Sequence, residues 1–195
     1  MNNYEYIIAS LPVLSSDFRG ELNCKEILDE IAQQLDKKDL SGFKTLVDGF
    51  NPDCLNTDFY KKALKDKNNF IRNYFLYDLC VRNCKVRFLN KNLGRDLQTD
   101  TIDITGDDFE FEDTLKVEEI LSIDDILRRE RGLDDLMWDK IDSLCGLQVF
   151  SIDVIYAFIA KLQIVDRWLK LDPERGRELF KELVNEIRNN KKSID

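Results

Sequence analysis

The sequence contains no histidine among its 195 residues. This absence excludes Ser-His-Asp and Cys-His nucleophilic catalysis, imidazole general-base chemistry at neutral pH, and metal sites that need a histidine ligand. Glycine and proline are also scarce, with eight and three residues, which leaves little material for a glycine-rich phosphate-binding loop. The composition therefore favours a protein that is not an enzyme.

The formal net charge is −9, which disfavours nucleic acids and anionic membranes as partners because both are negatively charged. This charge is unevenly distributed along the chain. Residues 61–95 contain ten basic and two acidic residues, a net charge of +8, whereas residues 96–142 contain five basic and seventeen acidic residues, a net charge of −12. Two interpretations are open: the two regions neutralise each other or stay solvated, or one of them forms a docking surface of a single sign.

The five cysteines, Cys24, Cys54, Cys80, Cys84 and Cys145, include no Cys-x-x-Cys pair, so the spacing indicates neither a redox motif nor a zinc site. Cys80 and Cys84 would share a helix face and could hold a soft metal ion. We favour the alternative, in which all five are buried free thiols in a reducing compartment. We expect no cofactor and no metal site.

No targeting or membrane-spanning segment is predicted. The first 14 residues have no basic region and include Glu5, unlike a signal peptide. The longest apolar stretch, residues 149–171, is interrupted by five charged residues, which exclude a spanning helix. We therefore expect a soluble, cytoplasmic protein.

Apolar residues recur at the helical period along most of the chain. Helices are predicted to begin after Asn23, at Asp39, at Thr57 or Asp58, at Asn68 or Asn69, near Leu115, after Ser122 or Asp125, after Ser151 and at Pro173. Gly132 is expected to interrupt the helical pattern. Residues 95–113 lose this period and predict an acidic loop or a small hairpin. The fold class is all-α, an irregular bundle of about seven to eight helices.

The loss of period at residues 95–113 also suggests a division of the chain. We expect an N-terminal helical part at residues 1–94, an acidic loop or linker at residues 95–113, and a C-terminal helical part at residues 114–195. The two helical parts are expected to pack as one compact unit.

Carboxylates are the main candidates that remain for acid-base or metal chemistry. Glu178 and Glu182 are four residues apart on a predicted helix and could share a magnesium ion. A carboxylate-only phosphohydrolase is therefore a third class of function. No nucleophile beside a base accompanies the pair, so our prediction is that the protein is not an enzyme.

Arg128, Arg129 and Arg131 form a short basic run in an acidic neighbourhood. The simplest partners are four nearby aspartates: Asp124, Asp125, Asp134 and Asp135. The alternative is that the arginines bind a partner protein. Trp138 and Trp168 stand at apolar helical spacing, which is typical of core residues, although a binding platform is the alternative.

Three segments together resemble a known family. Residues 129–138 resemble the pattern RER-x-x-D-x-L-x-W, residues 149–168 resemble F-x-x-[DE]-x-[IV]-x-A-[FY]-x-x-K-L followed by [DE]-R-W, and residues 69–75 resemble the helix start N-x-F-[IV]-x-x-[WY]-F. Their order along the chain also matches: together they resemble an uncharacterised bacterial family whose genes accompany those of V/A-type proton- or sodium-translocating ATPases. The resemblance spans Tyr4 to about Asn189.

The N-terminal pattern Tyr4-x-Tyr6-x-x-Ala9 also resembles the start of the C subunit of these ATPases, which is known as d in eukaryotes. The C subunit is an all-helical funnel that sits on the membrane rotor ring and receives the foot of the central stalk. It usually has arginine after this alanine, where the present chain has Ser10. The resemblance implies a non-catalytic coupling or assembly part, with other V/A-type ATPase subunits as partners.

The leading hypothesis is a non-catalytic structural or assembly component of a V/A-type ATPase that resembles the C subunit and links the central stalk and the rotor ring. It would be cytoplasmic and peripheral to the inner membrane through the ATPase complex. The alternative is an unrelated cytoplasmic helical adaptor for protein-protein interaction. The expected partner-binding residues are Arg128, Arg129, Arg131, Trp138, Arg167 and Trp168.

Overall fold

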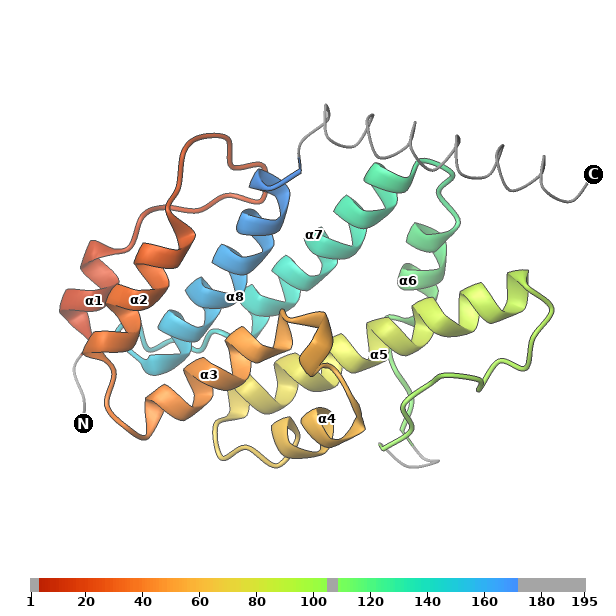
Figure 1. Cartoon of the computed structure of the whole chain (residues 1–195), viewed down its shortest axis with the longest axis horizontal. Coiled ribbons are helices and arrows are strands. Elements are labelled where there is room, and N and C mark those ends of the chain that lie inside the picture. The colour runs from red at the N-terminus through yellow and green to blue at the C-terminus, as the bar shows by residue number, and fades with distance from the viewer. Residues whose placement is uncertain (1–3, 105–108, 172–195) are drawn as a thin grey trace, which may run out of the picture.

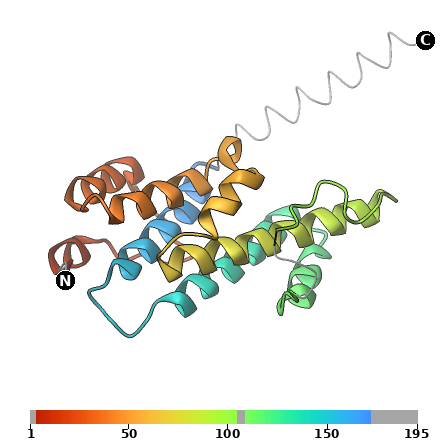
Figure 2. The same ribbon diagram turned by 90° about the horizontal axis from the view of Figure 1, so that it is seen from below.

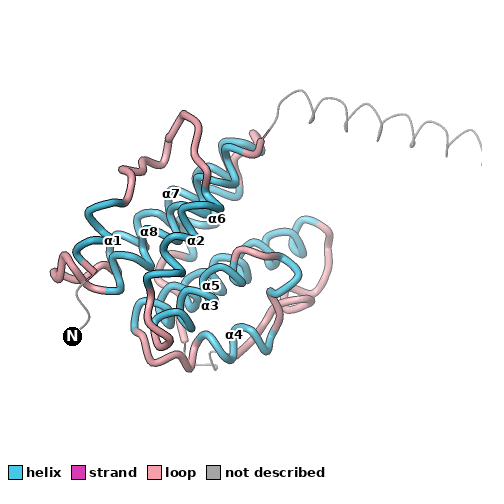
Figure 3. The backbone as a smooth tube through the Cα atoms, turned by 60° about the vertical axis from the view of Figure 1, so that its left-hand side comes forward, coloured by secondary structure: helices cyan, strands magenta, loops and turns pink. Residues whose placement is uncertain are grey.

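A computed structural model describes residues 4–104 and 109–171. Within these residues the regular elements are eight α-helices and one 3₁₀ turn, and every regular element drawn in Figure 3 is helical. They are α1 (Glu5–Ser10), α2 (Cys24–Gln34), α3 (Asp39–Gly49), η1 (Pro52–Cys54), α4 (Thr57–Ala63), α5 (Asn69–Asn92), α6 (Thr114–Leu121), α7 (Ile126–Leu144) and α8 (Ile152–Leu169). The all-α prediction is confirmed. The helix predicted from Pro173, with Glu178 and Glu182, lies outside the described residues.

Side-chain caps set the start of most of these helices. Asn23, Asn56, Asn68 and Asp125 each accept a hydrogen bond from a backbone N–H in the first turn of α2, α4, α5 and α7, as N-cap residues do. α3 begins at Asp39, as predicted, but the side chain of Asp39 does not cap it. Asp36 does so instead: its Oδ1 accepts hydrogen bonds from the backbone N–H groups of Lys38 and Asp39 at 3.0 and 2.9 Å.

The loop after α5 is held by two asparagines on that helix. Asn83 donates to the Ile102 carbonyl at 2.9 Å and accepts from the Ile102 N–H at 3.0 Å, while Asn90 donates to the Thr99 carbonyl at 2.7 Å. These side chains supply the hydrogen bonds that a second strand would otherwise provide. Of the two structures predicted for residues 95–113, the described part forms the loop.

The prediction that Gly132 interrupts the helical pattern is wrong, because α7 continues through this residue. A Cβ atom at Gly132 would lie 3.0 Å from Cγ2 of Ile120 in α6. This glycine therefore permits a close approach between α6 and α7, a tertiary cause that local propensity does not reveal.

The core is organised around α8, which α1, α2, α3, α5 and α7 all contact. Ile155, Ile159 and Leu162 on α8 have no exposed surface. Buried residues from both sides of the acidic loop join in one apolar cluster, and Figure 2 shows α5, α7 and α8 crossing through the middle of the molecule. None of the described helices is both long and apolar enough to cross a membrane.

The contact between α3 and α8 depends on Gly42. The Tyr156 hydroxyl donates to the backbone carbonyl of Asp39 at 2.7 Å. A Cβ atom at Gly42 would lie only 2.3 Å from this hydroxyl oxygen and 2.6 Å from Tyr156 Cζ. Because Tyr156 is only 1% exposed, its ring has no room to move away.

We therefore expect Gly42→Ala to lower the free energy of unfolding by about 1–2 kcal/mol, since overpacking outweighs the gain in helix propensity. Urea denaturation measures the change. Gly146→Ala is the matched control, because a Cβ atom there meets nothing within 4 Å. Equal stability of the two variants would contradict the tight contact.

Candidate functional site

The six residues predicted to bind a partner all lie on α7 and α8, but the structure divides them among three places. Arg131, Arg167 and Trp168 gather around Asp134. Trp138 lies in a different contact. Arg128 and Arg129 lie in the first turn of α7.

Asp134 is a buried carboxylate, 7% exposed, that connects α7 to α8. The Trp168 indole Nε1 donates to its Oδ2 at 2.6 Å, and the Arg167 guanidinium forms an ion pair with its Oδ1. The guanidinium carbon of Arg131 lies 4.3 Å from the centre of the Trp168 ring, a cation–π contact. Arg131 also donates to the backbone carbonyl of Ser16. These three predicted residues thus stabilise the fold by holding α7, α8 and the N-terminal loop together.

A cavity of about 390 Å³ opens beside Asp134, between α5, α7, α8 and the chain around η1. Three carboxylates and three cations line it, and each carboxylate pairs with one cation: Asp78 with Arg82, Asp134 with Arg167, and Asp166 with Lys170. No carboxylate of this cavity is left without a partner, so none is placed as a general base.

Asp78 is held by two donors, as Asp134 is. Its Oδ2 accepts hydrogen bonds from the Tyr60 hydroxyl at 2.6 Å and from Arg82 Nε at 2.8 Å. Burial, with the nearby Asp78 charge, raises the pKa of Tyr60 well above its ordinary value. Burial alone would lower the pKa of Arg82, but the adjacent Asp78 carboxylate raises it overall. Both groups therefore keep their protons and serve as donors.

Trp138 lies apart from this cavity. The Lys161 ammonium is 4.6 Å from the centre of its ring and forms an ion pair of 2.5 Å with Asp142. The ring is half-buried against the core. Trp138 therefore packs within the fold, with Lys161 between its ring and Asp142.

The expected ion pairs between the arginine run and four aspartates are not formed, although the burial that raises the pKa of Asp135 overall is opposed by the Arg131 charge. Among the ion pairs of the described residues, none joins Arg128, Arg129 or Arg131 to Asp124, Asp125, Asp134 or Asp135. Two of these aspartates have other partners: Asp125 caps the backbone of α7, and Asp134 forms an ion pair with Arg167 on α8.

Arg129 is instead used within the α6–α7 corner. Its Nε and Nη2 donate to the Ile123 carbonyl at 3.0 and 2.6 Å. Arg128 remains exposed, and within the described part of the chain its guanidinium has no hydrogen-bond or ion-pair partner. Of the three arginines, Arg128 is therefore the one whose guanidinium has no partner among the described residues.

Two exposed apolar residues beside Arg128 were not predicted as candidate binding residues from the sequence. Ile126 and Leu127, in the first turn of α7, are 69% and 61% exposed, and Ile123 just before them is 36% exposed. Adjacent helix residues diverge by about 100°, so a pair of apolar residues directly after a cap already indicated that one of them faces outward. We define the exposed α7 turn as Ile123, Ile126, Leu127 and Arg128.

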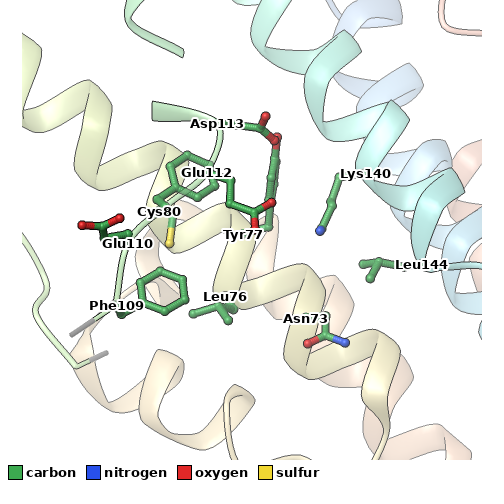
Figure 4. A pocket seen from close by; sticks show the side chains of 11 residues that line it. Asn73, Leu76, Tyr77, Cys80, Phe109, Glu110, Glu112, Asp113, Lys140 and Leu144 are labelled. Atoms are coloured by element: carbon green, nitrogen blue, oxygen red, sulfur yellow. The ribbon is translucent and has the colours of Figure 1, made fainter. Parts of the chain in front are cut away.

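A second cavity, of about 380 Å³, lies between α5, the end of the acidic loop and α7 (Figure 4). The Tyr77 hydroxyl donates to Asp113 at 2.8 Å, and the Lys116 ammonium pairs with the same carboxylate at 2.7 Å. Hydrogen bonds from Lys116 and Tyr77 lower the pKa of Asp113. Asp113 is therefore a charged anchor for the start of α6.

Cys80 borders the same cavity, and its sulfur points toward Phe109 in Figure 4. Burial raises the pKa of this thiol to about 11, so it stays protonated at neutral pH and is a poor nucleophile. All five cysteines are free, as predicted, but Cys54 and Cys145 are only half-buried. Among the described residues no group of three or more potential ligands could hold a metal ion.

We expect Asp134→Ala to lower the free energy of unfolding by about 1–3 kcal/mol, since it leaves the Trp168 donor without its acceptor and removes the ion pair with Arg167, whose side chain is about half exposed. Asp134→Asn should cost less, because the amide oxygen still accepts from Trp168. Asp124→Ala, at an exposed position, is the control and should change stability by no more than about 0.5 kcal/mol. Urea denaturation compares the three, and equal costs for the two alanine variants would refute the role of Asp134.

Comparison with known proteins identifies one family. A family model described as "Protein of unknown function (DUF2764)" matches residues 45–191, about three quarters of the chain. The matched region begins within α3 and includes Asp134 and the exposed α7 turn. No curated protein and no solved structure matches the chain. On this match, the chain belongs to the DUF2764 family.

Proposed function

We propose that this protein is a non-catalytic structural or assembly component of a V/A-type ion-translocating ATPase, similar to the C subunit, that docks between the central stalk and the membrane rotor ring. Its location would be peripheral to the membrane through that complex. The proposal joins the resemblance of the three sequence segments to one surface feature of the structure.

The residues that carry the resemblance support a shared architecture. Tyr74, Asp134 and Arg167 come from the three separate segments, and all three line the cavity between α5, α7 and α8. Side chains that fix the packing of long helices make a rigid scaffold, which suits a non-catalytic coupling part.

The exposed α7 turn is the observation that carries the docking role. Two large aliphatic side chains face outward beside an arginine without a partner in the described part of the chain. The Asp125 cap and the bond from Arg129 to the Ile123 carbonyl fix this turn from both sides. A rigid apolar surface with a flanking arginine has the composition of a protein-protein contact. Burial of one such aliphatic side chain by a partner would contribute about 1.5–3 kcal/mol.

A non-catalytic role is supported by how the candidate reactive groups are used. Asp78, Asp113 and Asp134 each accept hydrogen bonds from two internal donors. The buried Cys24 and Cys80 thiols have a pKa raised to about 11 by burial. The three aspartates therefore serve as internal hydrogen-bond acceptors, and burial keeps the two thiols protonated at neutral pH.

Affinity purification of the tagged protein from cells that express the ATPase, followed by mass spectrometry, tests the proposal. We expect ATPase subunits to co-purify. Consistent absence of the protein from both the intact complex and its assembly intermediates would exclude the ATPase role. Recovery of an unrelated partner through the same surface would instead indicate a helical adaptor.

A double variant, Leu127→Asp with Arg128→Glu, tests the surface. We expect it to reduce co-purification by about tenfold or more, because an apolar contact and a charge are lost together. Arg129 and Arg131 are left unchanged, since their bonds to the Ile123 and Ser16 carbonyls stabilise the fold. Circular dichroism verifies that the variant is folded.

Leu147→Asp is the control for the change of an exposed leucine to aspartate, because Leu147 is fully exposed in the α7–α8 connection, which projects at one end of the molecule in Figure 2. The control should bind as the unmodified protein does. Loss of binding in the control alone would move the docking surface to the α7–α8 connection and overturn the assignment to the exposed α7 turn.

A further inference from the structure

A lysine-lined cavity lies beside the Gly42–Tyr156 contact and shares no lining residue with the cavity next to Asp134. Its volume is about 560 Å³, and three separate segments contribute five lysines to it. Lys37 and Lys38 come from the α2–α3 connection, Lys62 from the last turn of α4, and Lys65 and Lys67 from the α4–α5 connection. These segments lie along the lower edge of the molecule in Figure 1.

The lysines of this cavity are free to bind. All five are exposed, and within the described residues none of their ammonium groups has an ion-pair or hydrogen-bond partner. Two other basic residues of the same sequence region are paired within the fold, Arg82 with Asp78 and Lys85 with Glu130. Three lysines of residues 61–95 that have no such pair among the described residues, Lys62, Lys65 and Lys67, lie at this cavity.

The two aspartates in the cavity wall are already used within the fold. Asp39 Oδ2 accepts from the Tyr4 hydroxyl at 2.5 Å, and Asp66 Oδ1 accepts from the Asn68 N–H at 2.8 Å. Five lysines and two aspartates leave a net charge of +3 at the cavity, on a chain whose overall charge is −9. Like charges in one concave surface repel each other, and a bound anion removes that cost.

The donors of the cavity indicate what kind of anion fits. A compact phosphate site is built from converging backbone N–H groups or from the rigid fork of arginine. Here the N–H groups of Lys38, Asp39, Asn68 and Ile71 are already bonded to capping side chains. What remains is separate point charges on flexible lysine stems, distributed over three segments. Carboxylates spaced along a polypeptide match that distribution.

We propose that this cavity binds an acidic segment of a partner protein, with its carboxylates paired to Lys37, Lys65, Lys67 and their neighbours. A flat anionic membrane is disfavoured because the lysines surround a concavity. This site is independent of the ATPase assignment and of the exposed α7 turn, and its test needs only the purified protein.

Titration of the purified full chain with a hexaglutamate peptide, at low and at high salt, measures the interaction. We expect binding at low salt that weakens as salt rises, because screening acts strongly on exposed charges. In the triple variant Lys37→Glu, Lys65→Glu and Lys67→Glu, we expect affinity to fall by about tenfold or more. The substituted side chains are exposed and have no partners within the described residues, and circular dichroism verifies that the variant is folded.

A control variant with the same change in net charge separates the site from the overall field. Lys25→Glu, Arg87→Glu and Lys91→Glu replace three basic residues outside the cavity and should leave the affinity within about twofold. Equal losses in both variants, or no binding of the peptide to the unmodified protein, would overturn the proposal. Tripolyphosphate and phosphatidylserine vesicles are the comparison probes, and tighter binding of either one than of the peptide would also overturn it.

Discussion

The burial of Asp134 constrains the arrangement of the long helices. A carboxylate removed from water costs several kcal/mol unless donors replace its hydration. Both donors here, Arg167 and Trp168, come from the last turns of α8. α7 can therefore pack on α8 only in the register that brings Asp134 to them. Because α1, α2, α3 and α5 also pack on α8, that register determines where most of the molecule lies.

The segregation of charge along the sequence has two different outcomes in the fold. Lys85 pairs with Glu130 across the boundary between the basic and acidic regions, as expected if the two neutralise each other. The lysines of the cavity instead have no carboxylate partner among the described residues. The first interpretation therefore holds for Lys85, whereas a docking surface of one sign is what we propose for the lysines of the cavity. The position of each lysine in the fold explains whether it is paired. Lys85 lies midway along α5, where it meets Glu130 of α7, whereas Lys65 and Lys67 lie in the connection before α5.

Helix positions were predictable because their causes are local. The caps at Asn23 and Asn68 and the apolar period of α8 lie within a few residues of the structure that they set. The partners of the arginine run were not predictable, since Arg131 bonds to Ser16, which is 115 residues away in the chain. Proximity in the sequence favoured the nearby aspartates as partners, but one of them, Asp134, instead binds Arg167 and Trp168 of α8. The place of Gly132 inside α7 was missed for the same reason, because the atom that a larger side chain would meet there belongs to Ile120 on another helix.

The two proposed docking surfaces differ in physical kind and in place. The exposed α7 turn is mainly apolar, so a contact there depends little on salt, whereas a contact at the lysine-lined cavity weakens as salt rises. In Figure 1 the start of α7 is near the upper edge and the cavity elements follow the lower edge. Between them, Asp134 joins α7 to α8, and Tyr156 joins α8 to α3 beside Gly42. Both surfaces thus belong to one closely packed body, in which two partners bound at once would be held at a fixed separation. Such an arrangement suits a protein that joins parts of an assembly, because it would fix the relative positions of the bound parts and needs no reactive group to do so.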